Sequence, residues 1–420
     1  HPRLGVWRFA FDNESDGLPR CMGDLTSASD VTRVRLESLE TGSPPRALRE
    51  GYLGIIRSSY ARHADAVLFE AARWPAYACA DKSANARAHA GTTEQAAPRE
   101  PMSPWRTAWT LATHGVDRWL RYLFVSESWN IGIVDRPIAS FLSSTDVSSA
   151  RWYPKREARR FMADPFGVVD DHGQHVFFES LYPGKHGEIW HETCEDYEWK
   201  GAPSRVLMLP VHLSYPFMVA DGARALCAPS TAAAMESALY EARAFPGDWR
   251  KVATLIAGEG GIDNTIVRWQ GRYWLFCGHR GDGPHYKLFA YSADRIEGPW
   301  RPHAANPVKI DARAARGAGT PFEAGDALYR PSQDCAATYG GRVTINKIRT
   351  LTESAFEEEA VAVVAPARDG VYREGVHTLS RFGDATLIDG KHSLISGAGL
   401  WYLLTRPLAW LVRAMRGGRG

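Results

Sequence analysis

The feature that most constrains the fold is a repeat with a period near fifty residues. Three segments share one order of parts: a short motif holding Asp or Tyr, a strand, a turn, an aromatic-rich strand, and a third strand ending near Trp. Their motifs contain Asp164, Tyr215 and Asp263, which stand 51 and 48 positions apart. A period of this length with about four strands per unit is typical of propeller blades.

Two further units and a closing strand complete the pattern. A fourth unit is expected at 329–334 followed by 341–348, and a fifth at 375–380 followed by 385–388. Residues 122–134 are expected to supply the strand that closes the ring. We therefore predict a mainly β chain whose largest domain, residues 105–395, is a five-bladed β-propeller.

The flanking segments have a different character. Residues 1–79 mix alternating strands with a helix near 53–72, which indicates a small α/β fragment. Residues 80–104 are expected to form a flexible linker, because 81–101 contain no large apolar side chain. Residues 396–420 are apolar with interspersed Arg, and predict an amphipathic helix that either docks on the protein or lies in a membrane interface. Within the propeller region, only 231–240 has helical character.

Charge and cysteine content exclude several classes of protein. The chain has 50 Lys and Arg against 48 Asp and Glu, and this balance argues against a nucleic-acid partner. Six cysteines without a CxxC motif argue against a disulfide framework and a structural zinc site. No GxSxG, HExxH or Walker motif occurs. We expect a cytoplasmic protein, with membrane contact only through the C-terminal segment.

A propeller would bring distant side chains to one place. The innermost strand of each blade lines the central channel, so Asp164, Tyr215, Asp263, Asp334 and His377 are expected to converge there. Neighbouring carboxylates repel one another and can retain a proton at neutral pH, as general acid–base chemistry requires. The many Trp and Tyr side chains suit stacking against sugar rings.

The region 129–390 resembles the N-terminal five-bladed propeller domain of plant glucosamine inositolphosphorylceramide transferases and their bacterial relatives. The resemblance rests on WNIGIVDRPI (129–138), ADPFG (163–167), FFESL (177–181), HLSYPF (212–217), GGIDNTI (260–266), GPWRPHAANPVKID (298–311), YRPSQDCAATYG (329–340) and GVHTLS (375–380). That domain is in turn similar to arabinanase- and xylosidase-type glycosidases. Residues 1–79 resemble, more weakly, the latter part of a formyltransferase-like domain.

The resemblance implies roles for individual residues. Asp164 matches the general base and Asp263 the carboxylate that tunes the pKa. Asp334 stands nearest to the general acid, but the fourth-blade Glu of those enzymes is not recognisable here, so His212 is a candidate replacement. His377 matches a channel histidine that can hold a metal ion, with calcium as the candidate.

Two functional hypotheses follow. The first is a carbohydrate-active protein that acts on a glycan or glycoconjugate in polysaccharide or glycolipid biosynthesis, with a carbohydrate or glycolipid as its partner. Its catalytic candidates are Asp164, Asp263, Asp334 and His212, and its substrate-binding candidates are Tyr215, Arg330, Gln333 and Trp274. The alternative is a non-catalytic glycan-recognition domain that assists a glycosyltransferase.

Structural interpretations of the same residues stay open at this point. Asp164 and Asp263 could cap turns, and Arg330 could form an ion pair with Asp334. His377 could be a hydrogen-bonded buried histidine. A basic stretch with Arg313 and Arg316 could be solvated surface or could contact an anion.

Overall fold

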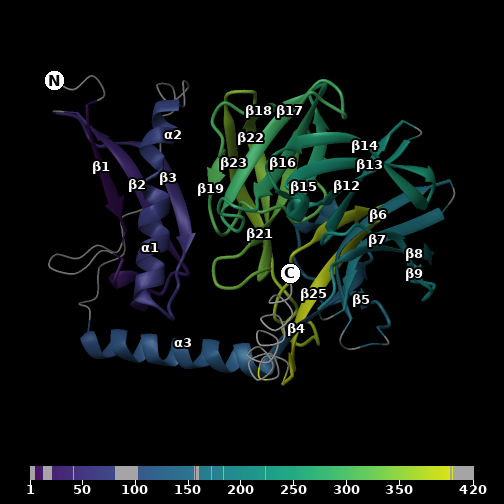
Figure 1. The fold of residues 1–420 in the computed structure, drawn as a ribbon, viewed down its shortest axis with the longest axis horizontal. Coiled ribbons are helices and arrows are strands. Elements are labelled where there is room, and N and C mark those ends of the chain that lie inside the picture. Colours follow the sequence, from purple (N-terminus) through teal and green to yellow (C-terminus); the bar gives the residue numbers. More distant parts are fainter. Residues whose placement is uncertain are drawn as a thin grey trace, which may run out of the picture.

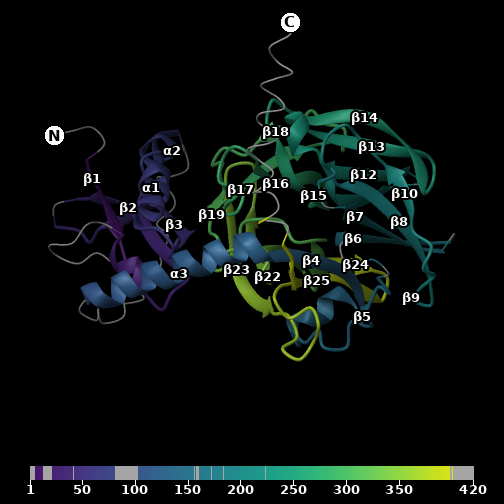
Figure 2. The ribbon, with the colours of Figure 1, turned by 60° about the horizontal axis from the view of Figure 1, so that its bottom comes forward.

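The computed structural model describes residues 5–12, 21–40, 42–80, 103–155, 157, 160–171, 173–182, 184–222, 224–397 and 400. The chain is mainly β, as the sequence predicted. A small N-terminal unit lies beside a larger body of β-sheets (Figure 1). The long helix α3 (Pro104–Phe124) runs from the side of the N-terminal unit to the larger body, as Figures 1 and 2 agree.

The N-terminal unit is an antiparallel sheet with two helices. Its strands pair in the order β1 (Val6–Phe11), β2 (Val31–Leu39) and β3 (Arg46–Gly54). Helices α1 (Tyr60–Ala71) and α2 (Trp74–Ala80) follow. The Ser59 hydroxyl caps α1 by accepting the N–H of Arg62. Trp74 is fully buried in the core of this unit.

The larger body contains five antiparallel sheets, which we number in chain order. Sheet 1 is β6 (Phe161–Asp170), β7 (Gly173–Leu181), β8 (Glu188–Glu195) and β10 (Ser204–Leu207), with β9 (Glu198–Trp199) on β8. Sheet 2 is β11 (Ser214–Asp221), β12 (Arg224–Ser230), β13 (Glu236–Ala244) and β14 (Gly247–Ala257). Sheet 3 is β15 (Gly261–Trp269), β16 (Arg272–His279), β17 (Lys287–Ala293) and β18 (Arg301–Pro302), with β19 (Lys309–Ile310) on β17.

The last two sheets complete the body. Sheet 4 is β20 (Phe322–Ala324), β21 (Ala327–Asp334), β22 (Arg342–Leu351) and β23 (Phe356–Val364). Sheet 5 is β24 (Leu379–Phe382), β25 (Ala385–Ile395), β4 (Val125–Val134) and β5 (Arg151–Trp152). Strand β4 pairs along its whole length with β25, so residues 125–134 of the expected strand 122–134 pair with the last strand of sheet 5, while residues 122–124 belong to α3.

The apolar core of the body is divided among the gaps between successive sheets. One cluster with Phe177 and Tyr240 lies between sheets 1 and 2, and another with Phe217 and Leu275 lies between sheets 2 and 3. Similar clusters fill the gaps between sheets 3 and 4 and between sheets 4 and 5. A fifth cluster, with Phe382 among its members, packs sheet 5 against sheet 1. Each sheet is therefore buried on two faces, which explains the near-continuous apolar runs in its middle strands.

The first strands of sheets 1, 2 and 3 share an unusual backbone feature. Asp164, Tyr215 and Asp263 have φ of +50°, +47° and +54°, and each lies at an irregularity of strand pairing. A β-bulge re-aims a side chain, and a left-handed residue other than Gly costs on the order of 1 kcal/mol or more. The repeated motif of the sequence is therefore a repeated bulge.

The structure differs from the sequence predictions in three places. Residues 329–334 belong to the second strand of sheet 4, because the short β20 precedes them. Residues 231–240 form a 3₁₀ turn (Ala232–Ala234) and strand β13 instead of a helix. Residues 104–124 form α3 where strands were expected. The predicted linker and the predicted C-terminal helix fall largely outside the described residues.

The N-terminal unit is fixed to sheet 3 by a buried ion network. Lys287 on β17 is fully buried, and its ammonium lies 2.8 Å from Glu70 of α1 and 2.6 Å from Asp282. Asp282 also pairs with Arg73. Helix α3 is mostly solvent-exposed and carries Trp105, Trp109 and Trp119 on its surface. Within the described ranges, none of the helices has both the length and the apolar character needed to cross a bilayer.

Candidate functional site

Four buried carboxyl groups and two cations gather where the first strands of the sheets meet. The first pair joins His377, two residues before β24, to Asp389 of β25, with His377 Nδ1 2.5 Å from an Asp389 oxygen. Asp389 also accepts the backbone N–H groups of His377, Thr378 and Asp164 at 2.9, 3.0 and 3.1 Å. Burial alone would raise the pKa of Asp389, but the charge of His377 and these donors hold it below its usual value.

The same ion pair shifts the pKa of His377 in the opposite direction, upward. Burial would lower the pKa of this imidazole, but Asp389 and Asp164 raise it above its ordinary value. Trp129 of β4 stacks on the ring at 3.9 Å between centroids, and Tyr339 meets its edge at 5.4 Å. His377 is therefore an enclosed imidazole with a raised pKa, held against the carboxylate of Asp389.

The second pair joins Asp263 of β15 to Arg316. Arg316 Nε donates to Asp263 Oδ2 at 2.6 Å, and the side-chain amide of Gln333 donates to the same oxygen at 3.1 Å. The guanidinium also lies over the Tyr339 ring and contacts His285. Arg316, which belongs to the basic stretch of the sequence, therefore offsets the charge of Asp263 inside the protein.

Asp164 of β6 has no such cation in direct contact. Its oxygens accept the Thr378 hydroxyl at 3.0 Å and the Tyr215 N–H at 3.1 Å, while His377 Nε2 lies 3.8 Å away. Burial raises the pKa of Asp164 to about 6; the charge of His377 opposes this, and the charges of Asp263 and Asp389 add to it. Asp164 is consequently ionised at pH 7 and protonated a little below pH 6.

Glu179 of β7 is the fourth carboxyl group, and sequence reasoning did not assign it. Burial, with the charges of Asp164 and Asp263, raises its pKa well above the usual value. His212 Nε2 lies 3.3 Å from Glu179 Oε1, and His212 Nδ1 accepts the N–H of Gly187 at 2.9 Å. Burial lowers the pKa of His212, so its ring is neutral and, by this hydrogen bond, carries its proton on Nε2, facing Glu179.

The charges of the cluster therefore divide into two groups. The pairs Asp389–His377 and Asp263–Arg316 each neutralise themselves. Among the described residues, Asp164 and Glu179 are the two carboxyl groups of the cluster without a hydrogen-bonded cation; the pKa of Asp164 is raised to about 6 and that of Glu179 well above its usual value. Two titratable groups whose environments push their pKa values apart are the arrangement that general acid–base chemistry uses.

We tested whether this cluster fits a metal ion. Single ligand atoms of Asp164, His377 and Asp389 lie within 4.8 Å of one another. Calcium takes six to eight oxygen ligands, whereas this set offers two carboxylates and one imidazole. Both Asp389 oxygens already accept hydrogen bonds, and His377 Nδ1 is already engaged with Asp389. The residues do not fit the expected calcium ion.

The other predicted residues lie in different surroundings. Tyr215 is buried beside the cluster, where its hydroxyl contacts Thr265 and Gly319. Asp334 points away, because its neighbour Gln333 reaches Asp263 and alternate strand residues face opposite sides; Asp334 accepts the Ala336 N–H instead. The Arg330 guanidinium is bound by Glu358 and two carbonyl groups, so its expected pairing with Asp334 is wrong. Trp274 packs in the core between sheets 3 and 4.

Four residues of the cluster were not placed in it from the sequence, and two of them carried a weak signal. Asp389 is the single acid of a strand whose neighbouring residues are mostly apolar. Glu179 directly follows the apolar residues Phe177 and Phe178. Both break the alternation that burial dictates, and a buried charge without a partner is costly. Arg316 and Trp129 gave no such signal, because a loop cation and a strand Trp are common in any fold.

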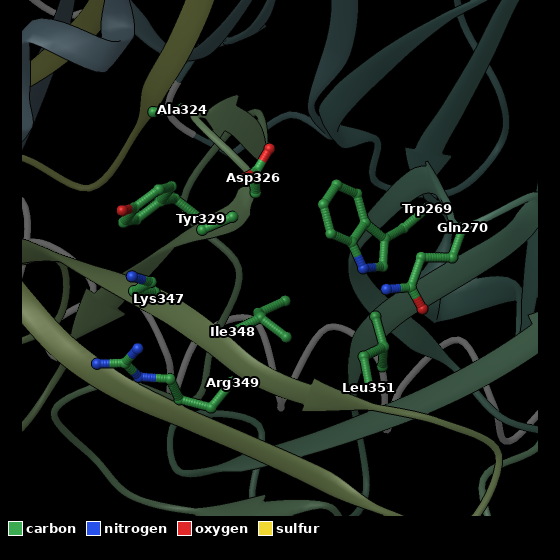
Figure 3. A pocket seen from close by; sticks show the side chains of 10 residues that line it. Trp269, Gln270, Ala324, Asp326, Tyr329, Lys347, Ile348, Arg349 and Leu351 are labelled. Carbon is green, nitrogen blue, oxygen red and sulfur yellow. The ribbon is translucent and has the colours of Figure 1, made fainter.

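A separate hollow of about 480 Å³ lies between the β15–β16 turn and sheet 4. Figure 3 shows the Trp269 indole on one side, near Gln270 and Leu351, while Tyr329, Lys347 and Arg349 extend on the other. It contains none of the four carboxyl groups, so the aromatic and basic residues here are not part of the cluster.

Comparison with solved structures gives remote likenesses. A family 117 glycoside hydrolase, Zg3597 from Zobellia galactanivorans, has 13% identity and a TM-score of 0.40, covering 65% of this chain and 91% of that one. A GH43_1 enzyme from Xanthomonas citri has 13% identity and a TM-score of 0.41, covering 61% and 92%.

Sequence relatives are nearer. Glucosamine inositolphosphorylceramide transferase 1 of Arabidopsis thaliana is 32% identical over 211 residues, 48% of this chain and 27% of that protein. The protein of the same name in Oryza sativa subsp. japonica is 30% identical over 235 residues, 54% of this chain and 30% of its own length. This chain thus spans less than a third of the length of either relative.

The family model described as glucosamine inositolphosphorylceramide transferase 1, N-terminal, matches residues 127–372. The match begins in β4 and ends between β23 and β24, so it includes Asp164, Glu179, Asp263 and Arg316. Because it covers more than half of the chain, the chain belongs to the glucosamine inositolphosphorylceramide transferase 1, N-terminal, family.

Proposed function

We propose that the five sheets are the blades of a five-bladed propeller whose channel acts on the sugar part of a glycolipid. Two observations support the ring: the apolar clusters fill all five gaps, including that between sheets 5 and 1, and sheet 5 is built from both ends of the body. The names of the plant relatives suggest a glycosylated inositol phospholipid as the type of substrate.

The observation that carries the proposal is the presence in one cluster of two buried carboxyl groups with raised pKa values, Asp164 at about 6 and Glu179 well above its usual value. Glu179 would donate a proton to the oxygen that leaves the sugar carbon, and Asp164 would accept a proton from the attacking hydroxyl. One carbon–oxygen bond breaks and another forms, so one proton is given and one is taken. His212 would act as a positioning residue, because its N–H fixes one Glu179 oxygen and leaves the other for substrate.

Enclosure of the cluster favours the second hypothesis, a glycan-recognition domain without turnover. Asp164 is 5% exposed and Glu179 4% exposed, and their oxygens already have partners in Thr378, Tyr215 and His212. A domain of this kind would bind a sugar at the channel mouth and leave the transfer to another protein.

Turnover of inositol-containing glycolipids and a glycan panel separates the two hypotheses. We expect turnover to rise with pH as Asp164 ionises near pH 6, and to fall at higher pH as Glu179 loses its proton. Asp164→Asn and Glu179→Gln should each lower kcat at least ~100-fold, whereas Asp384→Asn, on an exposed turn, should not change it. Binding without turnover in the unmodified protein would reject the catalytic proposal and support recognition.

A further inference from the structure

A basic stretch of sequence precedes the strand that carries Asp164. Residues 155–160 read KREARR, with four basic residues and one acid. Lys155 and Arg160 are described in the structure, and both are partly buried. Two cations held beside a channel need an explanation, because like charges repel and partly buried charges are usually paired.

Among the described residues, neither of these two cations is paired with an acid. Lys155 Nζ donates to the Ser128 hydroxyl at 2.9 Å and to the Trp129 carbonyl at 3.1 Å. Arg160 Nε donates to the Ser180 hydroxyl at 2.8 Å, and its guanidinium stacks on Trp190 at 4.1 Å. Arg160 Nη2 is buried and has no hydrogen-bond partner among the described residues. These partners are all neutral, so the part of the chain that the structure describes does not compensate the positive charge.

The electrostatic consequence is visible at Lys155. Burial, with the charge of Arg160 adding to it, lowers the pKa of this ammonium to about 8. An anion bound between the two side chains would relieve both effects, and Arg and Lys are the residues that bind phosphate groups in proteins.

The two cations also touch the residues that hold the proposed acid–base groups. Ser180, the partner of Arg160, follows Glu179 directly on β7. Trp129, the partner of Lys155, stacks on His377. A sugar bound at Glu179 would therefore carry a phosphate substituent toward Lys155 and Arg160.

We propose that Lys155 and Arg160 form a subsite for a phosphate ester attached to the sugar that occupies the channel. This inference rests on the proposed function and adds the charged part of the substrate to it. The group that binds is a phosphate, through its oxygen atoms. It belongs either to a phosphorylated polyol of a lipid headgroup or to free phosphate.

The test is calorimetric titration of the full chain with myo-inositol 1-phosphate, inorganic phosphate and uncharged myo-inositol. We expect inositol phosphate to bind at least ~10-fold more tightly than myo-inositol, and to weaken as salt rises. The double substitution Lys155→Gln with Arg160→Gln should remove that preference. Lys155→Arg, which keeps the charge, should retain it.

A matched double variant controls for the change in net charge. Arg250→Gln with Lys251→Gln removes two adjacent cations from the outer strand β14, and should leave binding unchanged. A thermal melt of each variant checks that it is folded. Equal affinity in the unmodified protein and the folded Lys155/Arg160 double variant, or equal binding of myo-inositol and inositol phosphate, would overturn the proposal. Inorganic phosphate binding as tightly as inositol phosphate would support the subsite and assign it to the free anion.

The turnover and binding experiments together distinguish failure of the phosphate subsite from failure of the proposed function. Loss of turnover in Asp164→Asn, without any preference for inositol phosphate, would reject the subsite and leave the function standing. A preference that depends on Lys155 and Arg160, without turnover of any glycolipid, would support the subsite and reject catalysis.

Discussion

Asp389→Asn should destabilise the protein strongly, because one carboxylate binds both the 377–378 segment beside it and Asp164, which is 225 positions away in the sequence. Asp389 Oδ1 accepts the N–H groups of His377 and Thr378, and Oδ2 accepts the N–H of Asp164 and contacts His377 Nδ1. An Asn carbonyl can replace only one oxygen, so its amide would face an N–H donor and the buried imidazolium would lose its nearest anion. Hydrogen bonds to charged groups contribute about 1.5–3 kcal/mol, and breaking a buried pair costs about 3–5 kcal/mol. We expect a loss of about 3–5 kcal/mol in the free energy of unfolding.

The assay is urea unfolding followed by Trp fluorescence, across pH 4 to 9. The pKa of Asp389 is depressed, so its contribution is complete above its unfolded value near 4 and is lost as pH falls through the folded value. The pKa of His377 is raised, so its contribution is complete below its ordinary value near 6.5 and is lost as pH rises through the folded value. The difference between unmodified protein and variant should therefore be largest between about pH 4 and 6.5.

The matched control is Asp384→Asn, the same chemical change on an exposed turn five residues earlier. It should change the free energy of unfolding by less than about 0.5 kcal/mol. A loss below about 1 kcal/mol for Asp389→Asn at pH 6, or a difference that does not vary with pH, would refute the reasoning about this carboxylate.

Two further substitutions test other parts of the molecule. Glu358→Gln removes the anion shared by the buried Arg330 and by Lys309, and should cost about 3–5 kcal/mol in urea unfolding while ligand affinity of the folded protein stays the same; a loss of affinity with unchanged stability would instead return Arg330 to the ligand site. Asp164→Asn should remove a pH-dependent part of stability. The raised pKa of Asp164, about 6, means that the folded protein holds this proton more tightly than the unfolded chain, so the contribution is complete below about pH 4 and is lost as pH rises through about 6. The unmodified protein should therefore lose stability relative to the variant over that interval, and parallel pH profiles would contradict the pKa.

The repeat predicted the sheets well where each unit had the same internal order. Asp164, Tyr215 and Asp263 occupy equivalent bulges, as their spacing indicated. The fourth unit was shifted by one strand, because β20 has three residues and no pattern in a run of that length can be recognised. This shift is why Asp334 was expected in the cluster, where its neighbour Gln333 lies instead.

The helix α3 was misread although its pattern was present. Trp105, Trp109, Val116 and Trp119 recur at helical spacing, but their aromatic character favoured strands. The partners inside the cluster could not be predicted, since Asp389 and Arg316 meet Asp164 and Asp263 only through tertiary contacts between distant segments. Sequence patterns describe faces of single elements, and these contacts depend on how five separate sheets are placed.

The pairing of β4 with β25 has a consequence for how the protein is made. Its paired residues are separated by roughly 250 to 270 positions in the sequence, far more than the residues paired within a hairpin. Such long-range pairs raise the contact order of the protein. During translation β4 leaves the ribosome before most of the body exists, and its ladder partner β25 is made only after the other sheets. The mostly apolar stretch from Trp129 to Val134 is fully buried in the native protein. It stays without its strand partner until β25 has been synthesised. Its protection from aggregation during synthesis therefore depends on chaperones or on the speed with which the last strand arrives.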